Sequence, residues 1–269
     1  LSFPRVLRGM FDLVRSLFDI TVEEADNEEG LSLWHPDVRF FRVVKNGITK
    51  AYFYLDPYSR PHNKNCGAWM DPVSGASASL GTIPIALIVC NVTPPAEAQI
   101  CSNGVCTIRP PLMTIDEVST LFHEFAHALQ HVLTEEECGL VSGCQGIEWD
   151  AVELPSQFME NWCRYAPTLK SFARHIETDD PIPDALVDKI AAARTHRAAY
   201  HTQRQVHFAI MDLEMHGMTR HPIDIFRLEQ QVARRTMVKQ PLAEDRYLAT
   251  FTHMFAGGYA AAYYSYKWA

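Results

Sequence analysis

The chain has no long apolar run. Its longest apolar stretch, from Ile83 to Cys90, is interrupted by Pro84, whereas a helix that crosses a bilayer needs about 20 mainly apolar residues. We therefore expect neither a membrane-spanning helix nor a membrane partner. No secretory signal peptide is visible, although the chain begins at Leu1 rather than at a methionine, so a targeting segment further upstream would not be seen.

Positive charge is also in short supply. The chain has 24 Lys and Arg against 32 Asp and Glu, a formal net charge of −8. A nucleic-acid-binding protein normally presents a basic face, so this class is excluded as a leading interpretation. The content of 47% hydrophobic and 21% charged residues is ordinary for a soluble globular protein. A chain of 269 residues can form one large domain or two lobes around a cleft.

The cysteines do not form a disulfide framework. There are seven, an odd number, and their spacing does not repeat, which indicates a reducing compartment. We expect a cytoplasmic protein, with a mitochondrial or plastid location as the alternative. Cys101 and Cys106 could face each other across a hairpin, but no second pair lies nearby to complete a structural zinc ribbon. Internal repeats and low-complexity segments are also absent.

What the chain does have is the motif His123-Glu124-Phe125-Ala126-His127. On an α-helix the two histidines lie on one face, one turn apart, so that both imidazoles can reach one metal ion. Glu124 can then lie against a metal-bound water, which is the arrangement of zinc peptidases. Thr114 and Glu117 form a capping-box pattern ahead of an apolar stripe at helical spacing, so we expect a helix over about 114–133. The alternative is a buried helix whose histidines are ordinary core residues.

A catalytic zinc ion needs a third protein ligand. His131 lies eight residues after His123, about 12 Å along a helix, which is too far for one ion to bind both. We expect His131 to support the site or to be exposed.

A second acidic helix offers a better ligand. If 147–165 is a helix, then Asp150, Glu153, Gln157 and Glu160 share one face. Acids on a mostly apolar helix are costly to bury without a positive partner. A metal would be such a partner, and Glu153 at the centre of the stripe is the natural ligand. Glu148, Asp150 and Glu160 remain alternatives, and a solvated helix face is the plainer interpretation. Pro155 weakens the helix locally.

Three phenols near the end of the chain form another pattern. Tyr259, Tyr263 and Tyr266 are spaced for one face of a helix expected over about 247–267, and Gly257-Gly258 precede them. These glycines would let the backbone flex or approach a peptide closely. An aromatic stripe of this kind is more often part of a core, but phenols could also donate hydrogen bonds to a developing oxyanion.

Several of these stretches together resemble the thimet oligopeptidase and oligopeptidase A family. They are 122–129 with the His-Glu-x-x-His motif, 148–162, 33–38 beginning Leu-Trp-His-Pro, 67–71 with Gly-Ala-Trp-Met-Asp, and 253–266 with His-Met-Phe-Ala-Gly-Gly-Tyr. The motifs occur in a fixed order from about Trp34 to Ala269. This order makes the resemblance far more specific than the metal motif alone.

The resemblance implies roles for particular residues. His123, His127 and Glu153 correspond to the zinc ligands, Glu124 to the general base and Tyr266 to a transition-state donor. His253, Tyr259 and Tyr263 match substrate contacts, with His253 counted among the catalytic residues. Gly257 and Gly258 belong to the same substrate-binding segment, and Asp150 is expected to orient a ligating imidazole. The family typically has Gly at the position of Ala126, a change that a helix tolerates.

The expected fold is α+β and mostly helical, a zincin-like catalytic core with a small antiparallel sheet. We expect an amphipathic helix over 6–18, a hairpin of strands 38–44 and 51–55 around Asn46-Gly47, and a third strand over 85–90. If that third strand is an edge beside the zinc helix, an extended peptide could add to it. Further helices are expected over about 184–216 and 224–238.

The division we expect is 1–113, a helix and a small sheet, and 114–269, a helical zinc- and substrate-binding region of the same catalytic domain. Family members are considerably longer, so we expect a fragment of a longer enzyme. The function expected is zinc-dependent hydrolysis of short peptides by a monomer. The alternative is a catalytically inactive zinc-binding or interaction fragment.

Overall fold

The computed structural model describes residues 1–95, 99–102, 105–108, 110–217 and 223–269. The chain forms two compact units: residues 1–146 with 155–190, and residues 147–154 with 191–269. The boundaries between the units fall at 146, 154 and 190. Each unit has an apolar core of its own. Among the described residues, none of the helices combines the length and apolarity needed to cross a bilayer.

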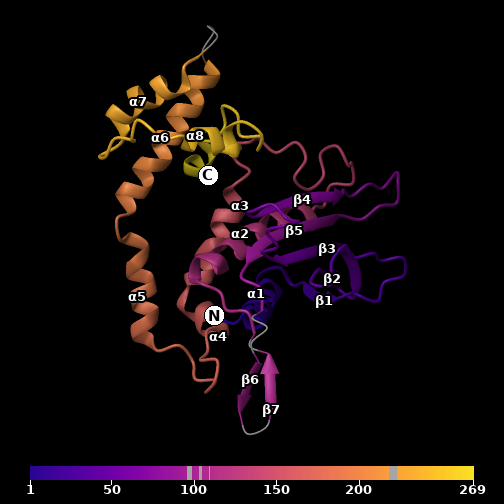
Figure 1. Cartoon of the computed structure of the whole chain (residues 1–269). Helices are drawn as coiled ribbons and strands as arrows, with labels where there is room; N and C mark the ends of the chain where they lie inside the picture. Colours follow the sequence, from indigo (N-terminus) through magenta and orange to yellow (C-terminus); the bar gives the residue numbers. More distant parts are fainter. Residues whose placement is uncertain (96–98, 103–104, 109, 218–222) are drawn as a thin grey trace. The chain divides into compact units, whose positions relative to one another are not determined.

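The first unit contains a five-stranded sheet with the strand order β1-β2-β3-β5-β4 (Figure 1). Its strands are β1 (Thr21–Glu24), β2 (Arg39–Lys45), β3 (Ile48–Tyr58), β4 (Trp69–Ser74) and β5 (Ile85–Val92). β3 and β5 run parallel, while the other neighbouring pairs are antiparallel. The sheet is thus mixed, and the expectation of an antiparallel sheet was wrong. The cause is β4, which intervenes in sequence but pairs outside β5, so that the chain returns to β3 in the same direction.

The position of β5 also corrects the expectation of an edge strand over 85–90. β5 lies between β3 and β4, and most of its residues are buried, as is typical of an interior strand with both faces covered. The edge strand next to it is β4, whose first four residues are all half-buried or exposed. Any peptide that adds to this side of the sheet would therefore pair with β4.

The hairpin between β2 and β3 is confirmed. Asn46 and Gly47 both have positive φ, 53° and 74°, which is the geometry of a type I′ turn and the reason why Asn-Gly is a strong hairpin signal. A separate hairpin joins β6 (Gln99–Ser102) to β7 (Val105–Ile108), and its register places Cys101 opposite Cys106.

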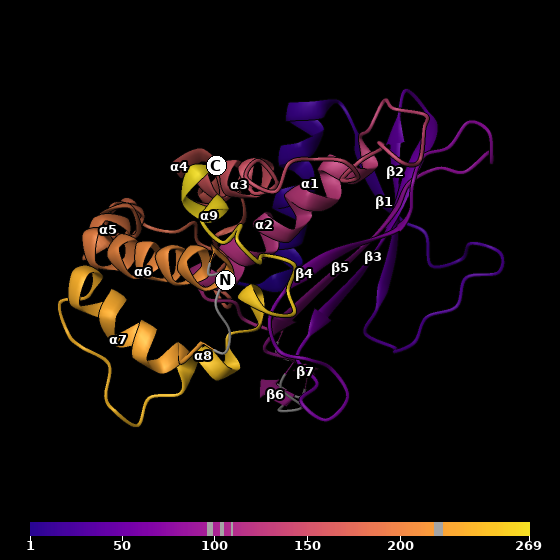
Figure 2. The ribbon, with the colours of Figure 1, turned by 90° about the horizontal axis from the view of Figure 1, so that it is seen from above.

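Helices α1 (Phe3–Phe18) and α2 (Ile115–Val132) lie along one face of the sheet (Figure 2). The α1 helix confirms the amphipathic helix expected over 6–18. Phe11 of α1 packs edge-on against Phe41 of β2, with ring centroids 5.3 Å apart, and Phe53 of β3 packs against Phe125 of α2 at 5.5 Å. This aromatic contact joins both helices to the centre of the sheet, and so fixes the face of α2 that points away from the core.

The beginning of α2 is confirmed as a capping box. Thr114 Oγ1 accepts from the backbone N–H of Glu117, and the Glu117 carboxylate accepts from the backbone N–H of Thr114, at 3.2 and 2.7 Å. Two N–H groups that the first helical turn cannot pair internally are thereby satisfied.

A buried charge cluster fixes the end of β3. The Asp56 carboxylate accepts from both guanidinium nitrogens of Arg60, from Lys64 Nζ and from Trp34 Nε1, while Lys64 Nζ also donates to three backbone carbonyls. Burial alone raises the pKa of Asp56, but the hydrogen bonds from Arg60 and Lys64 outweigh it and hold that pKa below its usual value. The cluster ties the loop after β3 to both parallel strands.

Three expected helices were wrong in extent. The helix expected over 147–165 begins only at Leu154 as α3 (Leu154–Arg164), with Pro155 in its first turn, where a proline costs no hydrogen bond. The long helix expected over 184–216 is broken into α5 (Asp184–Thr195) and α6 (Ala198–Gly217) at Arg197, whose φ is 54°.

The helix expected over 247–267 is replaced by three short helical pieces. They are α8 (Tyr247–Thr250), η1 (Thr252–Met254) and α9 (Ser265–Trp268). The positive φ of Gly258 (84°) and of Ala261 (58°) interrupts the helix between them. The hydrophobic spacing was real, but it reflects a turn-rich segment packed on a core.

The second unit has its core on α6. Helices α6 and α7 (Ile225–Thr236) pack together, and α9 contacts α6. Phe208, Met211 and Met215 of α6 meet Leu228 and Val232 of α7 in this core. The first unit is completed by α4 (Ala166–Phe172), which packs on α1.

The capping box makes a prediction about stability. Thr114→Ala removes the side-chain acceptor at the start of α2 and should lower the free energy of unfolding by about 1 kcal/mol. Thr120→Ala is the matched control, since Thr120 is exposed in the interior of the same helix and should change stability by less than about 0.5 kcal/mol. Urea unfolding followed by circular dichroism measures both. Equal losses in the two variants would contradict the capping role.

Candidate metal and catalytic site

Helix α2 presents His123 and His127 on one face. Their imidazole rings have centroids 5.0 Å apart and planes inclined at 81°, and both side chains are half-buried. The opposite face of the helix is occupied by Phe122, Phe125 and Leu129, which belong to the apolar core. The core side therefore sets the rotation of α2 and leaves the two imidazoles on the other side.

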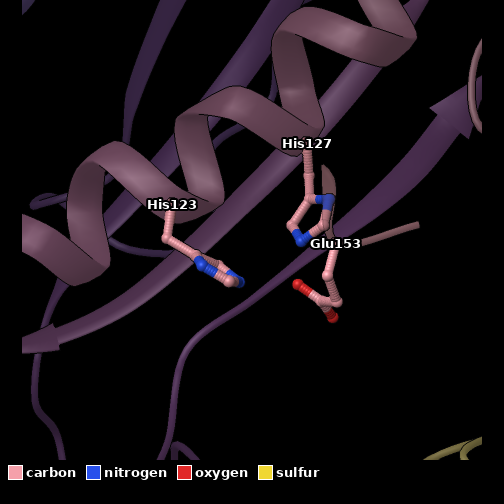
Figure 3. Close-up of side chains that lie close together, drawn as sticks. All are labelled: His123, His127 and Glu153. Atoms are coloured by element: carbon pink, nitrogen blue, oxygen red, sulfur yellow. The ribbon is translucent and has the colours of Figure 1, made fainter. Parts of the chain in front are cut away.

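Glu153 joins these histidines. It directly precedes the first residue of α3, and one ligand atom from each of His123, His127 and Glu153 lies within 4.8 Å of the others (Figure 3). Two ligands of a single zinc ion, each bonded at about 2.1 Å, are at most about 4.2 Å apart. Small rotations of the side chains would thus bring all three atoms into reach of one ion. The donor set of two imidazoles and one carboxylate is one that catalytic zinc sites use.

The carboxylate that holds His123 is that of Glu160, on α3. Glu160 Oε1 lies 2.7 Å from His123 Nδ1. Since a carboxylate accepts, Nδ1 carries the proton in this pair and Nε2 keeps its lone pair for a metal. Asp150, which was expected to orient an imidazole, has Oδ2 3.3 Å from the hydroxyl of Tyr264.

Glu124 follows His123 on α2 and is 6% exposed. A glutamate at this place in the motif shares the helix that carries both histidines, so its distance from them is fixed by the backbone. Glu153 is more deeply buried, at 1% exposure. Two carboxylates this shielded from water need positive charge or hydrogen-bond donors nearby.

The tyrosine segment of the second unit gathers without forming one helix. Tyr259 and Tyr266 stack with centroids 5.0 Å apart, and Tyr263 lies 5.2 Å from Tyr266. The His253 ring lies 6.0 to 6.2 Å from all three. The Tyr259 hydroxyl donates to Glu153 Oε1. The three rings expected to contact the substrate and the ring of Tyr266 therefore form one cluster within this unit.

Burial controls the ionisation of these phenols. It raises the pKa of Tyr263 to about 12, although Tyr263 Oη also donates to Gln205 Oε1 at 2.8 Å. The pKa of Tyr266 is raised as well, first by burial and then by the negative charge of Glu153. Both phenols stay protonated at neutral pH and keep a hydrogen to donate.

Sequence reasoning missed Asp212, which fixes this segment. Asp212 lies on α6, is fully buried, and accepts from the backbone N–H groups of Ala261 and Tyr263, each at 2.9 Å. His216 Nδ1 lies 2.8 Å from the same carboxylate. About fifty residues separate Asp212 from its partners, and no local pattern signals such a contact.

The two expected glycines occupy tight places. Gly258 has a φ of 84°, and a β-carbon there would lie 3.2 Å from the ring of Trp149. A β-carbon at Gly257 would lie 2.9 Å from the backbone of His253. Both positions therefore favour glycine for packing reasons, and Gly258 also for its positive φ.

His131 was expected to support the site or to be exposed. The structure excludes exposure: the side chain is fully buried, and Nε2 lies 2.7 Å from the carbonyl oxygen of Ser74, the last residue of β4. His131 therefore contacts the edge strand.

Comparisons with known proteins agree with the geometry. The model of peptidase family M3 matches residues 1–269. The "Organellar oligopeptidase A, chloroplastic/mitochondrial" of Arabidopsis thaliana is 50% identical over 278 residues, which cover 100% of this chain and 34% of that protein. The oligopeptidase A of Escherichia coli is 42% identical over 99% of this chain and 38% of its own length.

A more distant relative has a different name. The dipeptidyl carboxypeptidase of Salmonella typhimurium is 31% identical over 97% of this chain and 37% of its own length. The chain thus spans between 34% and 38% of the length of these relatives. The family match over all its residues confirms the resemblance found in the sequence, and the chain belongs to peptidase family M3.

Proposed function

We propose that this chain carries the catalytic centre of a zinc-dependent peptidase that hydrolyses peptide bonds in short peptides, on a zincin-like fold. The observation that carries the proposal is the convergence of His123, His127 and Glu153 within 4.8 Å of one another. Membership of peptidase family M3 and the oligopeptidase names of the relatives support the substrate class.

His123, His127 and Glu153 would hold the zinc ion. A bound zinc ion polarises a water molecule and lowers its pKa towards 7. Glu160 keeps the proton on His123 Nδ1, and thereby presents Nε2 to the ion. Glu160 would therefore support the metal site by orienting His123, without binding the ion itself.

Glu124 is the general base of the proposed reaction. Its carboxylate takes a proton from the water that attacks the peptide carbonyl, and then delivers this proton to the nitrogen of the leaving amine. Glu124 is 6% exposed, so bulk solvent has little access to this proton transfer.

Tyr266 is proposed as a donor to the negative charge that develops on the carbonyl oxygen. Its raised pKa keeps the phenol protonated, and Tyr259 and Tyr263 lie against it. His253, Tyr259 and Tyr263 are proposed to contact the substrate, and the tight turn at Gly257-Gly258 to place them. The two backbone hydrogen bonds to Asp212 hold this segment in shape.

The free edge of β4 is the proposed seat of the peptide backbone. Among the strands that the structure describes, β4 pairs only with β5, and it contacts α2. An extended peptide can add to such an edge through main-chain hydrogen bonds. We propose short unstructured peptides as substrates, a monomer as the working form and the cytoplasm as the compartment.

The base makes the first functional prediction. Glu124→Gln keeps the shape of the side chain but cannot accept a proton, and should lower kcat for a quenched short peptide on the order of 10²- to 10⁴-fold. Zinc content, measured by atomic emission, should be unchanged. Glu135→Gln is the control, since Glu135 is exposed just beyond α2. Turnover of Glu124→Gln at the parent rate would exclude Glu124 as the base.

The proposed zinc ligands make the second functional prediction. Glu153→Ala should abolish stoichiometric zinc binding, whereas Glu160→Gln should weaken zinc by about 10- to 100-fold, because it replaces the charged acceptor of His123 Nδ1–H with a neutral amide. Asp150→Asn should have the smaller effect, since Asp150 contacts Tyr264. Competition with a chromogenic chelator gives all three affinities. Unchanged affinity in Glu153→Ala would move the ligand role to Glu148, Asp150 or Glu160.

A further inference from the structure

A side chain in the last turn of α2 is hydrogen-bonded to the end of the edge strand β4. His131 Nε2 donates to the carbonyl oxygen of Ser74 at 2.7 Å, from a side chain with 0% exposure. The two residues are 57 positions apart in sequence. This hydrogen bond is a direct tie between the helix that bears the proposed ligands and the strand proposed to seat the peptide.

The spacing of three histidines on α2 relates this hydrogen bond to the proposed metal ligands. His123, His127 and His131 follow one another at intervals of four residues and so project from neighbouring turns of one face. His123 and His127 approach Glu153, and His131 points to β4. A rigid helix thus fixes how far the end of β4 lies from the two imidazoles.

The segment 137–143, which follows α2, contacts both the end of α2 and the residues after β4. Ser142 Oγ accepts from the backbone N–H of Ala76, and the carbonyl of Glu137 accepts from Ala78, at 3.3 and 3.0 Å. Gly143 N–H donates to Thr134 Oγ1 at 3.1 Å. The segment 137–143 therefore holds both the residues that leave β4 and the end of the helix.

Gly143 packs directly on the imidazole. Its φ is 64°, and a β-carbon there would lie 2.3 Å from His131 Nδ1 and 3.0 Å from the His131 backbone. Nδ1 itself is buried without a hydrogen-bond partner among the described residues. A buried nitrogen left unpaired has a free-energy cost. The hydrogen bond from Nε2 to Ser74 and the packing against Gly143 therefore hold the ring in this position.

We propose that His131 is a positioning residue that sets the edge strand β4 for substrate binding, through its hydrogen bond to Ser74. The inference rests on the proposed function, because it takes β4 to be the strand on which the peptide lies. An edge strand that is already anchored loses little conformational entropy when a peptide pairs with it. The peptide therefore binds more tightly to the anchored strand. His131 acts through β4 and touches neither the metal nor the reacting atoms.

The substitutions follow from the geometry. His131→Leu fills the buried space but removes the donor, whereas His131→Gln can place an amide N–H near the position of Nε2. In a Glu124→Gln background, which prevents turnover, His131→Leu should weaken binding of a fluorescent extended peptide about five- to tenfold, the scale of one lost hydrogen bond. His131→Gln should recover most of that affinity. Zinc affinity should be unchanged in both.

A glycine pair tests the same contact from the other side. Gly143→Ala would force a β-carbon onto the His131 ring and should reproduce the loss seen with His131→Leu. Gly146→Ala is the matched control: its φ of 76° brings similar strain, but the nearest atom is Val141 Cγ1 at 3.8 Å. Gly146→Ala should therefore bind peptide like the parent.

Two further readouts separate positioning from general stability. Hydrogen exchange should accelerate at the β4 amides of His131→Leu, with the protein otherwise folded. In the Glu124-containing protein, KM for extended peptides should rise while kcat changes little. Thr114→Ala destabilises the same helix from its other end and should leave KM unchanged.

The outcomes are distinct. Peptide affinity equal to the parent's in His131→Leu, or equal loss in Gly143→Ala and Gly146→Ala, would overturn the positioning role. If the Glu124→Gln parent binds no peptide at all, the proposed function fails, and the link from His131 to substrate fails with it. Exchange at β4 that does not change in His131→Leu would show that Ser74 needs no anchor.

Discussion

The site depends on a carboxylate that has almost no water around it. Glu153 is 1% exposed, and an ionised group at such a place is unfavourable unless positive charge or donors surround it. The side chains that gather around Glu153 meet that condition: two imidazoles able to share a cation with it, and a phenol that donates to it. The same shielding strengthens every electrostatic interaction at the centre. The convergence of these groups is thus a requirement of burial as much as of chemistry.

Local patterns in the sequence predicted the parts of the structure that local physics controls. The capping box at Thr114, the Asn-Gly turn and the i, i+4 histidines each depend on a few neighbouring residues, and the structure contains all three. Where prediction failed, the deciding contact was distant. Periodicity could not show that β4 pairs outside β5, and so it gave the wrong edge. The tyrosines share a cluster through packing and through Asp212, not through a common helix.

The candidate ligands show the same division. The motif identified two histidines and the acidic stripe identified Glu153, although the helix assumed for the stripe begins only at Leu154. Glu160 lies on that helix and Asp150 lies before it, which is why their contacts differ from those of a continuous helical face. Which acid orients which imidazole is decided by tertiary packing. The sequence named three residues that the structure brings together, but it did not show which acid contacts which imidazole.

One residue of β4 has a consequence for the protein outside catalysis. Pro72 lies within this edge strand, opposite Ala86 of β5, and proline has no amide hydrogen. An exposed sheet edge with a complete row of donors invites strands of other molecules to join it, one after another. Pro72 interrupts that row. The strand can therefore pair with a short peptide along part of its edge, while it is a poorer template for the successive addition of further copies of the chain.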